Sequence, residues 1–328
     1  MSLPSSPAPV DPLALLRPRR RIEGISAVLL PFDASGKIDE EAFAAHVART
    51  AAAGIVPAVN MDTGYVHALD AATRGRLLGV AREVLGPARP GDLVAGACVV
   101  DAAGDAFDER AYHAACEPIL ARAATPVLFP SYGLNAGSDS DVIARLGLLS
   151  ARLPSFIGFE LSTAFVPSGR ILSLSAYRDL LHFSNCLGAK HSSLSRRLEW
   201  DRLALRDRER PEFRVYTGND LAIDMVRYGS DWLLGLSTAA PEAFARRDAW
   251  WAAGDPRFDE LDDALQALGD FAFRPPVPAY KHSMAQVLFL RGWIACDDPC
   301  PGSLRRPESD RQILATILAR IDAAAAAD

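Results

Sequence analysis

The stretch Asn185-Cys186-Leu187-Gly188-Ala189-Lys190-His191-Ser192-Ser193 is a short, mostly apolar run that contains one ammonium group. Its length and composition predict a buried β-strand. Lysine is rare in this chain, because only Lys37, Lys190 and Lys281 occur and arginine supplies the rest of the 35 basic residues. Arginine cannot replace lysine where a neutral amine is needed, since guanidinium stays protonated at any working pH.

Lys190 has two interpretations on this stretch alone. A lysine that is desolvated in a pocket loses its proton more easily and can attack a carbonyl to form a Schiff base. Alternatively, Lys190 ends a strand and extends its ammonium group to water, which is a purely structural role. The surrounding sequence has to discriminate between them.

Outward from this strand, short apolar runs alternate with amphipathic segments. Strands are predicted at 24–30, 55–59, 93–99, 126–130, 155–161, 186–190, 213–217 and 231–236. Helices are predicted after Asp39 and near 70–86, 108–123, 139–152, 173–184, 195–206 and 219–228. Such alternation is typical of a parallel sheet with crossover helices. Eight strand-like runs, with no Gly-x-Gly-x-x-Gly turn after the first, favour an α/β fold of the (β/α)8 TIM barrel type over an open doubly wound sheet.

The chain divides into three regions. Residues 1–20 are rich in Pro, Ser and Arg and predict a disordered N-terminal tail. Residues 21–240 hold the barrel. Residues 241–328 show only helical patterns, near 241–254, 256–271, 278–295 and 308–325, and predict a C-terminal helical extension packed on the barrel. Tryptophans in this extension are expected to dock it: Trp250, Trp251 and Trp293.

Composition argues against several classes of protein. The net charge of −6, without a basic cluster, argues against nucleic-acid binding. No apolar run has membrane-spanning length and no signal peptide is evident, so a cytoplasmic protein is expected. Five scattered cysteines predict reduced thiols, and neither a metal nor another cofactor is expected. A zinc-dependent aldolase is the remaining metal alternative, with ligands drawn from His46, His67, His113, His182 and His191.

Four blocks in the same order resemble the dihydrodipicolinate synthase/N-acetylneuraminate lyase family. Leu30 to Asp39 is similar to the family's Thr-Pro-Phe…Gly-x-(Val/Ile)-Asp opening, and Leu187 to Ser193 to its Gly-x-Lys-x-Ser/Ala block. Phe213 to Asp220 resembles its Ser/Thr-Gly-Asp-Asp pattern, and its C-terminal signatures are matched by Pro276 to Lys281 and Leu304 to Pro307. The resemblance implies a class I aldolase barrel with extra C-terminal helices, no cofactor, and a homodimer or homotetramer.

The resemblance also implies the role of Lys190. This lysine would form an imine with the 2-oxo group of pyruvate or another 2-oxo acid. Imine formation makes the carbonyl carbon an electron sink, so that the neighbouring carbon can lose a proton or break a C–C bond. The lysine that matches Lys281 lies outside the barrel mouth in the family, which implies a structural role for Lys281.

Asp62-Thr63-Gly64-Tyr65 aligns with the family's Gly-Thr-Thr-Gly-Glu loop, which holds the keto-acid carboxylate. The resemblance therefore implies a substrate-binding role for Asp62, Thr63 and Gly64. Asp62 departs from the pattern, because a carboxylate facing the substrate carboxylate is repulsive unless it is protonated or turned away. The alternative is that Thr63 and Gly64 only form a turn. Arg170 is a further candidate for binding a carboxylate with two hydrogen bonds.

Two parts of the sequence offer candidates for the residue that moves protons. Pro130-Ser131-Tyr132 resembles the family's Pro-Tyr-Tyr, which implies that Tyr132 joins a proton relay at a subunit interface; interface packing is the alternative. The family's strand-five tyrosine is missing from the stretch 156–163. Either Phe159 or Glu160 faces Lys190 in its place. An inward Glu160 could be the catalytic base, or it could pair with an arginine for structural reasons.

These features predict a Schiff-base lyase or aldolase that acts through Lys190 on a 2-oxo acid and then forms or breaks a C–C bond or removes water. The alternative is a non-catalytic or divergent relative that binds a small carbonyl compound and has lost the strand-five tyrosine.

Overall fold

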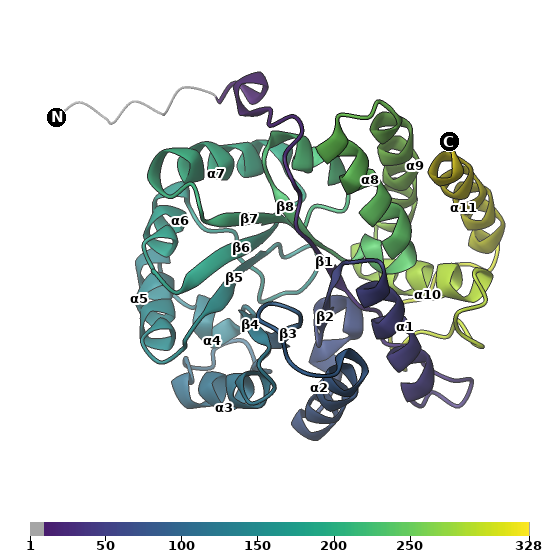
Figure 1. Ribbon diagram of the computed structural model, residues 1–328. Coiled ribbons are helices and arrows are strands. Elements are labelled where there is room, and N and C mark those ends of the chain that lie inside the picture. Colours follow the sequence, from purple (N-terminus) through teal and green to yellow (C-terminus); the bar gives the residue numbers. More distant parts are fainter. Residues whose placement is uncertain (1–9, 328) are drawn as a thin grey trace.

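The computed structural model describes residues 10–327 and shows a closed barrel of eight strands (Figure 1). All neighbouring strands are parallel, and β8 pairs with β1 to close the barrel. The strands are β1 (Gly24–Ala27), β2 (Val56–Val59), β3 (Val94–Ala97), β4 (Thr125–Leu128), β5 (Phe156–Leu161), β6 (Cys186–Ser192), β7 (Arg214–Thr217) and β8 (Asp231–Leu234). The predicted TIM barrel is thereby confirmed.

Helices follow the strands and surround the barrel (Figure 1). They are α1 (Glu40–Ala52), α2 (Ala71–Leu85), α3 (Glu109–Leu120), α4 (Tyr132–Asn135), α5 (Asp139–Ser150), α6 (Leu174–Leu181), α7 (Arg196–Glu209) and α8 (Pro241–Ala253). Most begin after an Asp or Ser whose side chain accepts a hydrogen bond from a backbone N–H of the first turn, which satisfies an otherwise unpaired donor.

One predicted helix is shorter than expected. The segment after β7 forms 3-10 turns over Ile223–Tyr228 instead of an α-helix over 219–228. The preceding side chains compete for the backbone, because Asn219 accepts from the N–H of Leu221 and Asp220 from that of Leu236. This part of the chain is therefore a loop at the carboxyl end of β7, where it can carry functional groups.

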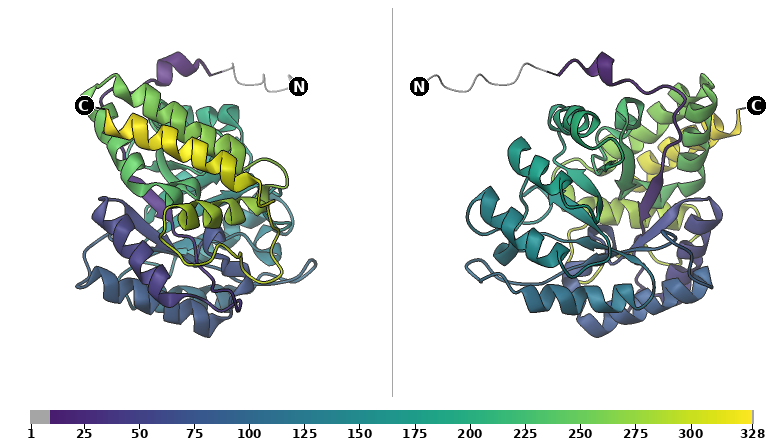
Figure 2. Two further views of the ribbon diagram at one scale, coloured as in Figure 1. Left: turned by 90° about the vertical axis from the view of Figure 1, so that its right-hand side faces the viewer. Right: turned by 60° about the vertical axis from the view of Figure 1, so that its left-hand side comes forward.

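The C-terminal helices are α9 (Arg257–Ala272), α10 (Tyr280–Leu290) and α11 (Asp310–Ala326). They lie with α8 on one flank of the barrel (Figures 1 and 2). The three tryptophans are all in ring contacts: the Trp293 ring lies 4.0 Å from the Arg49 guanidinium of α1, while Trp251 packs on Phe258 and Trp250 on Arg257. The extension is thus joined to the barrel by side chains of both parts.

The N-terminal tail is only partly covered by the structure, since residues 1–9 lie outside the described part. From Pro12 onward the segment is packed rather than disordered. Pro12–Leu15 form a 3-10 turn, and Leu15 is buried against Leu203 and Met225. The apolar side chain of Leu15 explains this difference, because its burial offsets the entropy lost by a segment that is otherwise polar.

The interior of the barrel is filled by an apolar cluster. Its members include Ile25, Ala27, Ala58, Met61, Val94, Cys98, Val127, Phe129, Ile157, Tyr216 and Leu233. Polar groups gather where the strands end, as is usual for this fold. Among residues 10–327, no helix is long and apolar enough to cross a membrane.

Candidate active site

Lys190 lies on the inner face of the barrel, near the carboxyl end of β6, and is 7% exposed. Among residues 10–327, no carboxylate forms an ion pair with its ammonium group. Its Nζ lies 4.7 Å from the centroid of the Phe159 ring. Burial lowers the pKa of Lys190 to about 8, although the charges of Asp220 and Asp62 act in the opposite direction. A useful share of this amine is therefore neutral near pH 8, which is the nucleophilic form.

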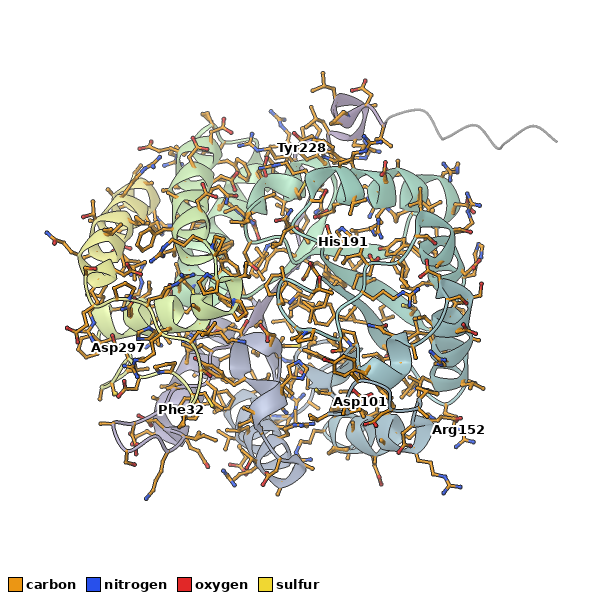
Figure 3. All side chains as sticks on the ribbon, turned by 180° about the vertical axis from the view of Figure 1, so that it is seen from behind. Phe32, Asp101, Arg152, His191, Tyr228 and Asp297 are labelled. Carbon is orange, nitrogen blue, oxygen red and sulfur yellow. The ribbon has the colours of Figure 1, made fainter. Side chains whose placement is uncertain are left out.

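The residue on β5 that faces Lys190 is Phe159. These two are partners in the parallel register, while Glu160 is the partner of His191. Because side chains alternate along a strand, Glu160 and His191 both point away from the barrel interior. Figure 3 labels His191, which lies well inside the outline of the molecule, whereas the exposed Arg152 lies at its edge.

The structure places Glu160 away from Lys190, in a buried network between the barrel and the helices. Its carboxylate accepts hydrogen bonds from Arg202, at 2.6 and 2.7 Å, and from the backbone N–H of Leu172, and it lies 2.7 Å from Nδ1 of His191. Burial alone would raise the pKa of Glu160, but Arg202 and His191 lower it to about 2. Glu160 therefore does not face Lys190 and is not placed to be its catalytic base. The apolar ring of Phe159 occupies that position instead.

Two groups after β7 complete the surroundings of Lys190. Gly218 packs directly on the lysine, since a Cβ at this position would lie 2.7 Å from Cε of Lys190. Asp220 is buried, and burial raises its pKa to about 7 even though Leu236 donates a backbone hydrogen bond and Lys190 is nearby. The Asp220 carboxyl group can thus exchange a proton near neutral pH.

The loop after β2 meets α10 at the barrel mouth. Asp62 lies 2.9 Å from Nζ of Lys281 and accepts a hydrogen bond of 3.0 Å from the Tyr280 hydroxyl. Thr63 Oγ1 lies 2.9 Å from the same hydroxyl. Burial alone would raise the pKa of Asp62, but the Lys281 ammonium, together with His67 and the hydrogen bond from Tyr280, leaves it below the ordinary value. Lys281 therefore lies at the mouth, where its ammonium group is paired with Asp62.

Gly64 and Thr63 have different surroundings. The N–H of Gly64 donates to the carbonyl of Met61, which is a turn contact and leaves that donor occupied. The Thr63 hydroxyl instead takes part in the contact with Tyr280. Of the three loop residues suggested for substrate binding, Asp62 and Thr63 present side chains to the site, while Gly64 shapes the turn.

A cavity of about 370 Å³ opens at the mouth. It is lined by Asp62, Tyr65, His67, Asp101, Tyr132 and Lys281, among others. Lys190 is not one of its lining residues, but Asp62 links the two, because it borders the cavity and its charge raises the pKa of Lys190. The cavity therefore adjoins Asp62 but does not include Lys190 itself.

Tyr132 lines the 370 Å³ cavity, and together with Arg170 it also lines a second cavity of about 410 Å³. The backbone N–H of Tyr132 donates to Asp101, which fixes the start of α4. The Arg170 guanidinium is engaged with Asp139 at 2.6 Å and with the carbonyls of Asn135 and Gly137. Arg170 would have to give up such contacts to bind a substrate carboxylate with two hydrogen bonds.

Sequence reasoning missed Tyr280 and Asp220 as site residues. The available signal was weak: a tyrosine beside Lys281 in a proline-rich segment, and a carboxylate two residues after the glycine of the strand-seven block. Among residues 10–327, no group of three or more His, Cys, Asp or Glu side chains is arranged to hold a metal ion.

Solved structures share this architecture. A dihydrodipicolinate synthase from Thermotoga maritima has a TM-score of 0.78 and 18% identity, covering 92% of this chain and 99% of its own. The enzyme of that name from Acinetobacter baumannii, complexed with pyruvate, has a TM-score of 0.75 and 18% identity, with the same two shares covered. YagE from E. coli K12, a dihydrodipicolinic acid synthase family protein in complex with pyruvate, has a TM-score of 0.77 and 17% identity, covering 92% and 98%.

No protein-family model and no curated protein matches the sequence. At 17–18% identity, the structural likeness speaks for the fold. The chain therefore has the fold of the dihydrodipicolinate synthase family proteins, over nearly its whole length.

Proposed function

We propose that this protein is a Schiff-base-forming lyase or aldolase of the dihydrodipicolinate synthase type. Lys190 attacks the carbonyl carbon of pyruvate or another 2-oxo acid, the carbonyl oxygen leaves as water, and an imine forms. The cationic imine then accepts electrons from the neighbouring carbon, so that a C–C bond can form or break or a hydroxyl group can leave.

The observation that carries this proposal is the state of Lys190. Its amine is buried near the carboxyl end of a barrel strand, and its pKa is lowered to about 8. Among residues 10–327, no carboxylate forms an ion pair with it. A structural lysine would instead reach water or a carboxylate. Two solved structures with the same fold contain pyruvate, which supports a 2-oxo acid as the substrate.

Trapping the imine tests the proposal. The protein is incubated with pyruvate or a related 2-oxo acid and reduced with borohydride, and the adduct is located by peptide mass analysis. The chain suits this experiment because it has only three lysines. We expect the reduced adduct on Lys190 alone. Lys190→Arg should abolish it, and Lys37→Arg, at an exposed position, should leave it unchanged.

The alternative is a relative that binds a small carbonyl compound without catalysis. Phe159 favours it, since this ring occupies the place opposite Lys190 where a proton-transferring group would be useful. Pyruvate binding detected by calorimetry, with no adduct from any 2-oxo acid tested, would support this alternative over the Schiff-base lyase.

A further inference from the structure

Three side chains from two distant parts of the chain form a continuous hydrogen-bonded series at the barrel mouth. Thr63 Oγ1 lies 2.9 Å from the Tyr280 hydroxyl, which donates over 3.0 Å to Oδ2 of Asp62. Lys281 holds the other carboxylate oxygen of Asp62 at 2.9 Å. Thr63, Asp62 and Tyr280 are buried, at 2%, 6% and 2% exposure. We call these three residues the Thr63–Tyr280–Asp62 series.

Packing fixes the position of the Tyr280 ring. It is stacked on Phe273, with ring centroids 4.2 Å apart, and has an edge contact with Phe165. On its other side it approaches Gly235, where a Cβ would lie 3.0 Å from the ring and 2.8 Å from Thr63 Oγ1. Glycine at this position leaves the room in which the two hydroxyl groups meet.

The donors in this series have a defined direction. Asp62 is ionised, because Lys281 holds its pKa below the ordinary value, so it can only accept from Tyr280. Tyr280 has then used its one proton and accepts from Thr63. The remaining lone pair of Thr63 Oγ1 is left as an acceptor for a further proton. The paired charges of Asp62 and Lys281 cancel, which also removes the repulsion of a substrate carboxylate that Asp62 alone would cause.

We propose that the Thr63–Tyr280–Asp62 series moves the proton in the reaction of the Lys190 imine, in place of the strand-five group that Phe159 does not supply. This inference rests on the proposed function. Tyr280 acts through Thr63 and is a positioning residue in the relay, contributed by the C-terminal extension. That extension thereby becomes part of the active site rather than only a support for the barrel.

The proton step balances as follows. A C–H bond breaks on the carbon next to the imine, and its electron pair becomes the C=C bond of the enamine while the nitrogen loses its positive charge. Thr63 Oγ1 takes the proton and passes its own to the Tyr280 oxygen. Tyr280 in turn passes its proton to Asp62, which becomes a neutral carboxyl group beside Lys281. Reversal of these transfers protonates the enamine.

Exchange of the methyl protons of pyruvate in D2O, followed by proton NMR, tests this relay separately from imine formation. We expect Tyr280→Phe to retain the borohydride-trapped adduct on Lys190 and to lose roughly a hundredfold or more of the exchange rate, the range typical of a positioned acid–base group. The double variant Asp62→Asn/Lys281→Met, which keeps the site neutral, should behave in the same way.

Tyr177→Phe is the matched control, because Tyr177 is also buried and its hydroxyl has no hydrogen-bond partner among the described residues. It should leave both trapping and exchange unchanged. Trapping with undiminished exchange in Tyr280→Phe would overturn the relay, as would loss of trapping in a folded Tyr280→Phe protein. Absence of a trapped adduct in the unsubstituted protein would instead count against the Schiff-base function itself.

Discussion

Phe159 and Lys190 face each other across β5 and β6, with Nζ of the lysine 4.7 Å from the centroid of the phenyl ring. The ring keeps water away from the amine and offers it only a weak cation–π attraction, which favours the charged form less than a carboxylate would. The pairing explains how an amine can be buried, lose its proton easily and still lie at the end of a barrel strand.

The pH dependence of imine trapping follows from this environment. Burial lowers the pKa of Lys190 to about 8, and only the neutral amine attacks a carbonyl. We therefore expect the initial rate of pyruvate adduct formation to rise with pH up to about 8 and to level off above it. Timed borohydride quenching across this range measures the profile; a rate still rising tenfold per unit above pH 9 would show an ordinary, exposed lysine.

Asp220 should tune this profile. Its carboxylate favours the charged form of Lys190, so Asp220→Asn should lower the pKa of the lysine and move the midpoint of the trapping profile to lower pH. The Asn oxygen can still accept the hydrogen bond from the N–H of Leu236. Asp255→Asn, at a partly buried ion pair with Arg257, is the control and should leave the midpoint in place. An unchanged midpoint in Asp220→Asn would remove Asp220 from the electrostatics of the lysine.

The barrel was predictable from sequence because its signal repeats in every strand and helix. Which of Phe159 and Glu160 faces Lys190 could not be predicted from the sequence. The β5–β6 register shifts between Phe156 and Ile157, so Phe156 pairs with Cys186 but Ile157 with Gly188. Such an irregularity places an additional residue in one strand. Which side chains of that strand face the barrel interior then cannot be deduced by counting residues from its ends. The contact of Asp62 with Tyr280 spans 218 positions of sequence, beyond the reach of local patterns.

The Glu160 network should contribute to stability. Glu160→Ala would leave the Arg202 guanidinium buried without its carboxylate, and removal of one partner of a buried ion pair typically costs about 3–5 kcal/mol of the free energy of unfolding. Glu40→Ala, in the exposed pair with Arg76, should cost less than about 1 kcal/mol. Urea unfolding of both variants compares them. Equal, small losses would mean that the buried charges are solvated in the folded protein.

The close contact of Gly218 with Lys190 provides the last prediction. A Cβ at position 218 would lie 2.7 Å from Cε of Lys190 and 2.1 Å from Oγ of Ser192, so both side chains would have to move. Because a small displacement of a nucleophile can reduce a rate about a hundredfold, Gly218→Ala should slow imine trapping strongly while the protein stays folded. Gly75→Ala is the control, since nothing lies within 4 Å of its added methyl group in α2. Circular dichroism confirms that each variant is folded. Equal trapping rates in the two variants would show that the position of the Lys190 side chain does not depend on Gly218.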